Sequence, residues 1–326
     1  MTKNLKIFLI AFIASLPLFL GINVIEERIN DFFFWDEMAS NPEILAAQVN
    51  QQILGQKLRE LAPIKDLTTE DFVMESEAAT SVFIDEEGQE KILFEKSRDK
   101  KLPIASLTKL MTVYVALKNY DTDLIVEIEK EAAEMPGNGE GKLKVGEKFR
   151  VKDLLYPILI ESNNTAAYTL ANLIDEENFL ELMNLEAERF GLDDTYFVNP
   201  TGLDPEDSKD PINYSTARDL VELVKNLLGN ELIWEINSIP EFDFYTPEGI
   251  YHHRIINTNE LLLDPEWQDK IIGGKTGFTY EAGECFLLVV EAPKEKGYLI
   301  NVILGSEDRF LEMKRLLRWI YRAYNW

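Results

Sequence analysis

Strand-like segments occupy both ends of the region from residue 72 to residue 326, and helical segments lie between them. Two short runs, 81–85 and 91–94, flank an acidic turn containing Gly88, and this pattern predicts a hairpin. Three more strands are predicted at 271–276, 285–291 and 298–304. Because a sheet must bury a face against another layer, this order favours an α/β (α+β) fold. We expect a mostly antiparallel sheet built from both ends of the domain, with a helical subdomain beside it.

The middle of this region carries apolar residues at helical spacing. Pro103 lies just ahead of the first predicted helix, a position that suits a helix entrance, and Ser215 is the expected cap of the fifth. The predicted helices span 106–117, 151–159, 166–174, 179–190, 216–228 and 307–321.

Ser106 and Lys109 lie three residues apart at the start of the first predicted helix. Residues at this spacing share a helix face, so the hydroxyl and the amine can come within hydrogen-bond distance. Such a pair is a nucleophile with its own base. The pattern alone is common, and its alternative interpretation is a capping serine beside a solvated lysine.

Two further short motifs follow in the order that such a site needs, Ser-Asn-Asn at 162–164 and Lys-Thr-Gly at 275–277. Taken singly, Ser162 and Asn164 could merely cap the helix that follows them, and Lys275 could be a solvated strand end. Taken together with the serine–lysine pair, the three motifs predict one catalytic site.

Composition excludes several classes of function. The formal net charge of -25 argues against nucleic-acid binding, which depends on clustered Lys and Arg. Cys285 is the only cysteine, so the chain has no intrachain disulfide, and its apolar surroundings predict a buried thiol rather than a nucleophile. The only histidines, His252 and His253, cannot supply a multi-histidine metal site and are expected to be exposed loop or strand residues.

The N-terminal segment has the features of a membrane element. Residues 7–25 carry no charge and are long enough to cross a bilayer as a helix. Lysines precede the segment and acidic residues follow it, so residues 1–6 are predicted to be a cytoplasmic stub and the rest of the chain to lie outside. A cleaved signal peptide is the alternative, but no small-x-small cleavage site follows directly.

Residues 26–71 are predicted to connect the membrane element to the catalytic domain. Within them, 41–61 has the pattern of an amphipathic helix. The following polar, acidic stretch indicates a linker, and the catalytic domain is expected to span 72–326.

The three motifs are accompanied by several other runs, and with them the chain resembles the serine-type D-alanyl-D-alanine carboxypeptidases, the low-molecular-mass penicillin-binding proteins. The resemblance extends from about Thr80 to the end. Its fold is the β-lactamase/transpeptidase-like sandwich. The runs that carry it are 103–112, 162–164, 183–184, 199–204, 215–220, 257–259 and 274–279.

The resemblance implies an acyl-enzyme on Ser106, with Lys109 as the base that takes its proton. Lys109 must be neutral for this, and burial beside a second cation, Lys275, is expected to lower its pKa. Ser162 would pass a proton to the leaving amine, and the Asn164 amide would hold the lysine and the substrate's backbone carbonyl.

The same resemblance assigns substrate binding to the edge-strand motif. Lys275 and Thr276 would bind the terminal carboxylate of the substrate, and Gly277 would let a peptide backbone approach. The backbone N–H of Phe278, with that of Ser106, would form the oxyanion hole. No metal or organic cofactor is required.

The expected activity is removal of the terminal D-alanine from peptidoglycan stem peptides, with β-lactam antibiotics as covalent inhibitors. The expected location is the bacterial cytoplasmic membrane, with the catalytic domain extracytoplasmic. Two positions depart from the family: Thr165 replaces a frequent Asp, and Thr258 stands where some relatives carry an arginine that grips the substrate.

Three alternatives remain. The same site could act as an endopeptidase on cross-links. The domain could be a β-lactamase, for which Glu181 and Asn184 superficially suggest a water-holding pair, although they lie within an amphipathic helix whose Met183 faces inward and their spacing is three rather than four. It could also be a non-hydrolytic β-lactam sensor on a membrane anchor.

Overall fold

The computed structural model describes residues 63–137 and 143–326. The chain divides into a large unit, residues 66–324, and a small one, residues 1–65 with 325–326. The large unit begins ahead of the domain boundary predicted near residue 72. The strands are β1 (Ile64–Lys65), β2 (Ala78–Ile84), β3 (Glu90–Lys96), β4 (Leu102–Pro103), β5 (Ile125–Glu127), β6 (Lys148–Arg150), β7 (Tyr214–Ser215), β8 (Glu241–Tyr245), β9 (Tyr251–Ile256), β10 (Ile271–Thr279), β11 (Gly283–Glu291), β12 (Tyr298–Ser306) and β13 (Tyr324–Asn325).

The helices fall between these strands and after them. The α-helices are α3 (Lys109–Asn119), α4 (Lys130–Ala133), α5 (Val151–Leu159), α6 (Asn164–Asn172), α7 (Glu176–Arg189), α8 (Ala217–Leu227), α9 (Glu231–Asn237) and α10 (Arg309–Ala323). The 3₁₀ turns are η1 (Ala105–Thr108), η2 (Glu260–Leu263), η3 (Gln268–Lys270) and η4 (Pro293–Glu295).

The central sheet has five strands in the order β10-β11-β12-β2-β3, and every neighbouring pair is antiparallel. Strands from the two ends of the domain meet where β12 pairs with β2, with Ile300 opposite Val82. The prediction of an antiparallel sheet built from both ends is confirmed.

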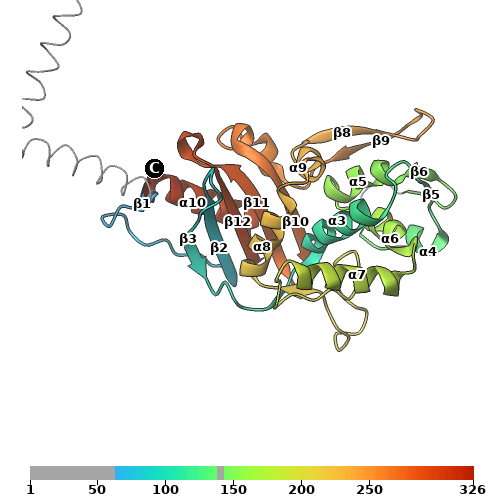
Figure 1. The fold of residues 1–326 in the computed structure, drawn as a ribbon, viewed down its shortest axis with the longest axis horizontal. Helices are drawn as coiled ribbons and strands as arrows, with labels where there is room; N and C mark the ends of the chain where they lie inside the picture. Colours follow the sequence, from blue (N-terminus) through green and yellow to red (C-terminus); the bar gives the residue numbers. More distant parts are fainter. Residues whose placement is uncertain (1–62, 138–142) are drawn as a thin grey trace, which may run out of the picture. The chain divides into compact units, whose positions relative to one another are not determined.

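Both faces of the sheet are covered. All seven residues of β2 are buried, and a strand buried on both faces requires a layer on each side. Helix α8 packs against β2 and β12, whereas α10 packs against β11 and β12. Helices α3 to α7 form a region beyond the β10 edge of the sheet (Figure 1), and α9 packs against β10.

The predicted helices are present, with local differences. The cap of α8 is Thr216, whose side chain accepts a hydrogen bond from the Asp219 backbone, so the assignment of this cap to Ser215 was wrong. Pro103 lies in β4, paired with Tyr214, rather than at the helix entrance. The chain enters α3 through the 3₁₀ turn η1.

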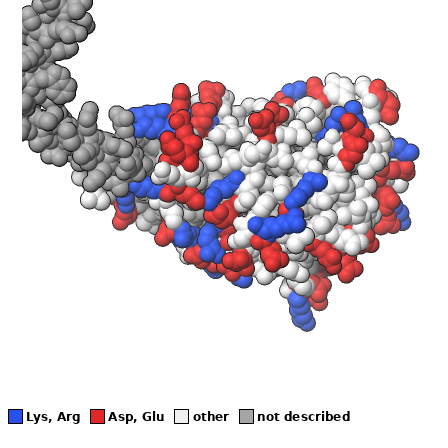
Figure 2. Space-filling view, in the orientation of Figure 1, with Lys and Arg blue, Asp and Glu red and all other residues white. Residues whose placement is uncertain are grey.

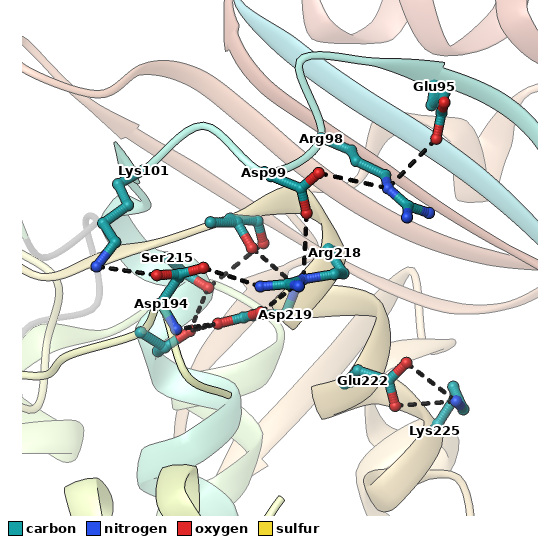
Figure 3. A network of polar contacts seen from close by, with 12 residues as sticks. Glu95, Arg98, Asp99, Lys101, Asp194, Ser215, Arg218, Asp219, Glu222 and Lys225 are labelled. Carbon is teal, nitrogen blue, oxygen red and sulfur yellow. Dashed lines mark hydrogen bonds and ion pairs between the residues drawn. The ribbon is translucent and has the colours of Figure 1, made fainter. Parts of the chain in front are cut away.

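A network of polar contacts ties the start of α8 to two loops (Figure 3). The Arg218 guanidinium contacts Asp194 at 2.8 Å and Asp99 at 3.2 Å. The buried carboxylate of Asp219 accepts hydrogen bonds from the Asp194 backbone at 2.8 Å and from the Thr195 hydroxyl at 2.9 Å. The network therefore holds the segment that follows α7 against the sheet-covering helix.

The hairpin β8–β9 was not predicted, and it changes the interpretation of the histidines. His252 and His253 lie in β9 with side chains only 11% and 15% exposed, so the expectation of exposed residues was wrong. Cys285 is buried as predicted, and burial raises the pKa of its thiol to about 11.

Within 63–137 and 143–326, no helix is both long and apolar enough to cross a bilayer. The predicted membrane segment 7–25 and the amphipathic helix 41–61 lie outside the described residues.

Candidate active site

Ser106 and Lys109 meet at the start of the first helix, as their spacing predicted. Ser106 lies in the 3₁₀ turn η1, and Lys109 is the first residue of α3. The Lys109 amine is 2.8 Å from the Ser106 hydroxyl oxygen. The preceding residue, Ala105, has a φ of +47°, which is a strained conformation for a residue with a side chain. Ser106 therefore stands on a sharp, fixed turn.

The Lys109 amine has two further partners, both carbonyl oxygens. It donates to Oδ1 of Asn164 and to the backbone oxygen of Thr201, each at 2.6 Å. A neutral amine has two N–H groups and one lone pair. The two carbonyls take both N–H groups, so the lone pair of the neutral amine faces the hydroxyl proton of Ser106.

The environment of Lys109 favours the neutral amine. Its side chain is completely buried, and burial is the main reason that its pKa lies well below the usual value of a lysine. The Lys275 cation adds a smaller contribution in the same direction. The sequence analysis attributed a lowered pKa of Lys109 to burial beside this cation. In the structure, burial is the larger of the two effects.

Ser162 and Asn164 lie on opposite sides of a helix start. Ser162 has a φ of +64° and precedes Asn163, whose side chain caps α6 by accepting from the Ala166 backbone at 2.9 Å. Asn164 is the first residue of α6, and its amide nitrogen donates to the Pro136 carbonyl at 2.7 Å. The cap is thus Asn163, which leaves Ser162 and Asn164 to face the site.

The third motif lies on β10, an edge strand of the sheet, as predicted. The buried Lys275 amine donates to the Ser162 hydroxyl and to the Thr276 carbonyl, each at 2.9 Å. The Thr276 hydroxyl is 2.6 Å from the hydroxyl of Thr258. Burial, with a smaller effect of the Arg309 cation, lowers the pKa of Lys275 to about 7.

A cleft of about 240 Å³ brings the motifs together. Lys109 and Lys275 are buried and do not line it, but each donates a hydrogen bond to a residue that does. Its walls include six of the eight predicted site residues, Ser106, Ser162, Asn164, Thr276, Gly277 and Phe278.

The segment 199–202 has a role at the site that the sequence argument missed. The Thr201 carbonyl binds Lys109, and the Asn199 side chain holds the segment by accepting from the Gly202 backbone at 2.7 Å. Gly202 has a φ of +83°, and a Cβ there would lie 2.0 Å from the Ala105 carbonyl oxygen. The Asn-Pro-Thr-Gly run was noted only as part of the resemblance, although a glycine between polar residues indicates a tight turn.

Arg309 is a second residue that the sequence argument missed. It lines the cleft from the start of α10 and donates to the Gly277 carbonyl at 2.9 Å. Its Nε is buried without a hydrogen-bond partner. The cleft thus has a guanidinium even though Thr258 occupies the position where some relatives carry arginine. Nothing in the local sequence around Arg309 indicates this role.

Glu181 and Asn184 lie away from the cleft, on a groove along α7. The Asn184 side chain forms hydrogen bonds to both the backbone nitrogen and the carbonyl of Phe197, at 2.9 and 2.8 Å. These bonds give Asn184 a structural role, so the pair is not placed to hold a hydrolytic water.

Comparison with known proteins gives a consistent result. The family model described as D-alanyl-D-alanine carboxypeptidase, Peptidase_S11, matches residues 67–308. The chain is 32% identical over 258 residues to the D-alanyl-D-alanine carboxypeptidase DacF of Bacillus subtilis, covering 76% of this chain and 63% of that protein. It is also 32% identical over 249 residues to a D-alanyl-D-alanine endopeptidase of Pseudomonas aeruginosa, covering 74% of this chain and 77% of that protein.

Solved structures share the fold. Penicillin-binding protein D2 from Listeria monocytogenes, in an ampicillin-bound form, superposes with a TM-score of 0.65 at 28% identity, covering 78% of this chain and all of that one. The β-lactamase/transpeptidase-like architecture expected from the sequence is thereby confirmed.

Proposed function

The chain belongs to the D-alanyl-D-alanine carboxypeptidase family, and we propose that it removes the terminal D-alanine from peptidoglycan stem peptides through an acyl-enzyme on Ser106. The observation that carries this proposal is the Ser106–Lys109 pair, in which two carbonyl acceptors orient the lysine lone pair toward the serine hydroxyl. The chain spans 63% of the length of the Bacillus subtilis relative, so activity and substrate are taken from the shared domain alone.

In the proposed reaction, the Ser106 oxygen attacks the carbonyl carbon of the penultimate D-alanine while its proton passes to Lys109. The backbone N–H groups of Ser106 and Phe278 are proposed to bind the oxyanion, a contribution of about 3 kcal/mol for each donor. The Ser162 hydroxyl, in contact with Lys275, would then deliver a proton to the departing D-alanine amine. Water subsequently hydrolyses the ester and restores Ser106.

Substrate binding is proposed to rest on two cations and a hydroxyl. Arg309 and Thr276 line the cleft, and the buried Lys275 contacts Ser162, which also lines it. Together they would bind the free carboxylate of the terminal D-alanine. A carboxylate beside Lys275 would also favour the ammonium form of this lysine, because an opposite charge raises a lysine pKa.

The proposed location is the outer side of the cytoplasmic membrane of a bacterium, with residues 7–25 as anchor or signal. This proposal rests on the sequence pattern of that segment and on the location of the proposed substrate.

On the face drawn in Figure 2, Lys and Arg are interspersed with Asp and Glu, as on an ordinary solvated surface.

The test is intact-mass measurement of the full-length chain with penicillin and, separately, with a D-Ala-D-Ala peptide, together with an assay of released D-alanine. A lasting penicillin adduct with D-alanine release is expected, and Ser106→Ala should give neither. The matched control is Ser238→Ala, at the end of α9 and outside the cleft. A Ser106→Ala chain that still releases D-alanine would overturn the proposal.

Endopeptidase action is the second candidate, and the match to an endopeptidase over 77% of that protein's length favours it. The two activities differ in the group that leaves. A cross-linked muropeptide dimer distinguishes them: a carboxypeptidase leaves it intact, whereas an endopeptidase cleaves it to monomers. An adduct with dimer cleavage and no D-alanine release would identify the endopeptidase.

A further inference from the structure

The two histidines of the chain face each other on β9. Successive side chains of a regular strand point to opposite faces of the sheet. Here Phe244 pairs with His253 and Tyr245 pairs with Tyr251, so His252 is the extra residue of a β-bulge. The bulge turns both imidazoles toward the same side, and their Nδ1 atoms lie 2.5 Å apart.

Each outer nitrogen of this pair contacts a carboxylate. His252 Nε2 lies 3.2 Å from Glu147, in the turn before β6, and His253 Nε2 lies 3.4 Å from Glu161, in the loop after α5. Among the described residues, these two carboxylates are the charged groups within hydrogen-bond or ion-pair distance of the pair. The neighbouring strands β6 and β8 present the rings of Phe149 and Phe244 to it.

The three contacts need three protons. One proton must lie between the two Nδ1 atoms and one between each Nε2 atom and its carboxylate. Two neutral imidazoles carry only two protons, so one contact lacks a hydrogen bond when both carboxylates are ionised. One additional proton from solvent gives an imidazole–imidazolium pair in which every contact is filled. Histidine ordinarily gains its proton between about pH 5 and 8.

The pair reaches the active site through Glu161. This residue lines the cleft and directly precedes Ser162. Its second carboxylate oxygen accepts from the Asn163 amide at 2.9 Å, and Asn163 caps α6, the helix that begins with Asn164. Ser162 itself has a φ of +64°, a conformation that persists only where the surroundings hold it.

We propose that His252 and His253 are positioning residues that hold the Glu161 carboxylate, and through it Ser162 and Asn164, most firmly when the pair carries three protons. This inference rests on the proposed function, because it concerns the same site. The hairpin β8–β9 thus couples proton uptake outside the cleft to the geometry inside it. Among the described residues, no group of three or more His, Cys, Asp or Glu side chains is arranged to hold a metal ion, so the pair is not assigned as a metal site.

Imidazole NMR tests the proton sharing directly. The chain has two histidines, so the full-length protein without a histidine tag shows signals from this pair alone. We expect both rings to shift together in one coupled transition. Glu161→Gln removes a negative charge and should move the midpoint to lower pH. Independent transitions with midpoints unaffected by Glu161→Gln would overturn the proposal.

The rate of acylation by penicillin tests the effect on the site. His253→Ala should slow acylation about tenfold at pH 6, and the deficit should shrink toward pH 9, where the wild-type pair has lost its third proton. His253→Gln retains an amide donor toward Glu161 at every pH and should stay near the wild-type rate at pH 6. Arg254→Gln, on the same strand but paired with Glu241, is the matched control. It should leave the acylation rate unchanged at pH 6 and at pH 9.

Equal slowing of His253→Ala at pH 6 and pH 9, or no slowing at pH 6, would overturn the positioning role. The two proposals fail differently. A wild-type chain that penicillin does not acylate contradicts the proposed function, whereas the NMR titration of the pair is read without any turnover. If His253→Ala does not fold, His253→Gln and the NMR comparison still decide the question.

Discussion

The Lys109 amine lies 2.8 Å from the Ser106 hydroxyl and has no exposed surface. Its other two contacts are to carbonyl oxygens, of Asn164 and Thr201, and neither can accept the serine proton in place of the amine. The arrangement places the neutral lysine where it can accept the proton of the Ser106 hydroxyl.

The first prediction concerns the charge of this lysine. Lys109→Arg keeps a long cationic side chain, but arginine does not lose its proton in proteins. We expect Lys109→Arg and Lys109→Ala to be equally impaired, with penicillin acylation slowed by about 10²- to 10⁴-fold. Stopped-flow acylation rates measure the effect. Near-normal acylation by the arginine variant would show that the side chain acts as a cation and not as a base.

The second prediction concerns stability and pH. The pKa of Lys275 is lowered to about 7 in the folded chain, whereas an unfolded lysine has a pKa of about 10.4. Between these values the unfolded chain binds the additional proton, so the free energy of unfolding should rise from about pH 7 to about pH 10.

Lys275→Met should flatten this rise, which urea unfolding at several pH values measures. Flattening will be partial, because the lowered pKa of Lys109 acts in the same direction. Lys130→Met, at an exposed position on α4, is the control. It should leave the pH dependence of the free energy of unfolding unchanged. An unchanged slope in Lys275→Met would contradict the prediction.

The third prediction concerns Arg309. If its guanidinium binds the substrate carboxylate, Arg309→Gln should raise KM for a D-Ala-D-Ala peptide by about tenfold or more with a smaller change in kcat, since a hydrogen bond to a charged group contributes about 1.5–3 kcal/mol. Arg315→Gln, on the same helix but outside the cleft, is the control. A loss confined to kcat would instead indicate that Arg309 supports the strand carrying Gly277.

The fourth prediction concerns the turn beneath the nucleophile. Gly202→Ala would place a Cβ 2.0 Å from the Ala105 carbonyl oxygen, so the turn must move and Ser106 with it. We expect strongly reduced acylation and a free energy of unfolding lowered by about 2 kcal/mol or more. Gly191→Ala also has a positive φ, +71°, but meets nothing within 4 Å. It should lose stability by strain alone and keep normal acylation.

The sequence predicted that the three motifs come together because each is a local pattern with a fixed consequence. The serine–lysine spacing follows from helix geometry, and the place of Lys275 on a sheet strand follows from the apolar runs around it. The order of strands and helices was enough to predict which ends of the domain pair with each other.

The parts that the sequence did not predict depend on contacts between distant segments. Arg309 reaches the cleft only because α10 begins beside β10. The spacing of apolar residues along the sequence does not show that these two segments lie together. Thr201 contacts Lys109 through its backbone carbonyl. Every residue type has this group, so the sequence does not reveal the contact. The paired histidines depend on a bulge in β9, and alternation along a regular strand would have separated them.

The placement of β12 between β11 and β2 has a consequence for the order of folding. Strand β2 can form its hairpin with β3 early, but its other edge waits for residues 298–306. Ser106, which lies between these two segments in the chain, therefore acquires its rigid support only when the ribosome has made nearly the whole domain. Sheet closure over so large a sequence separation is slow, and a chain halted before β12 would expose an open apolar edge instead of a working enzyme.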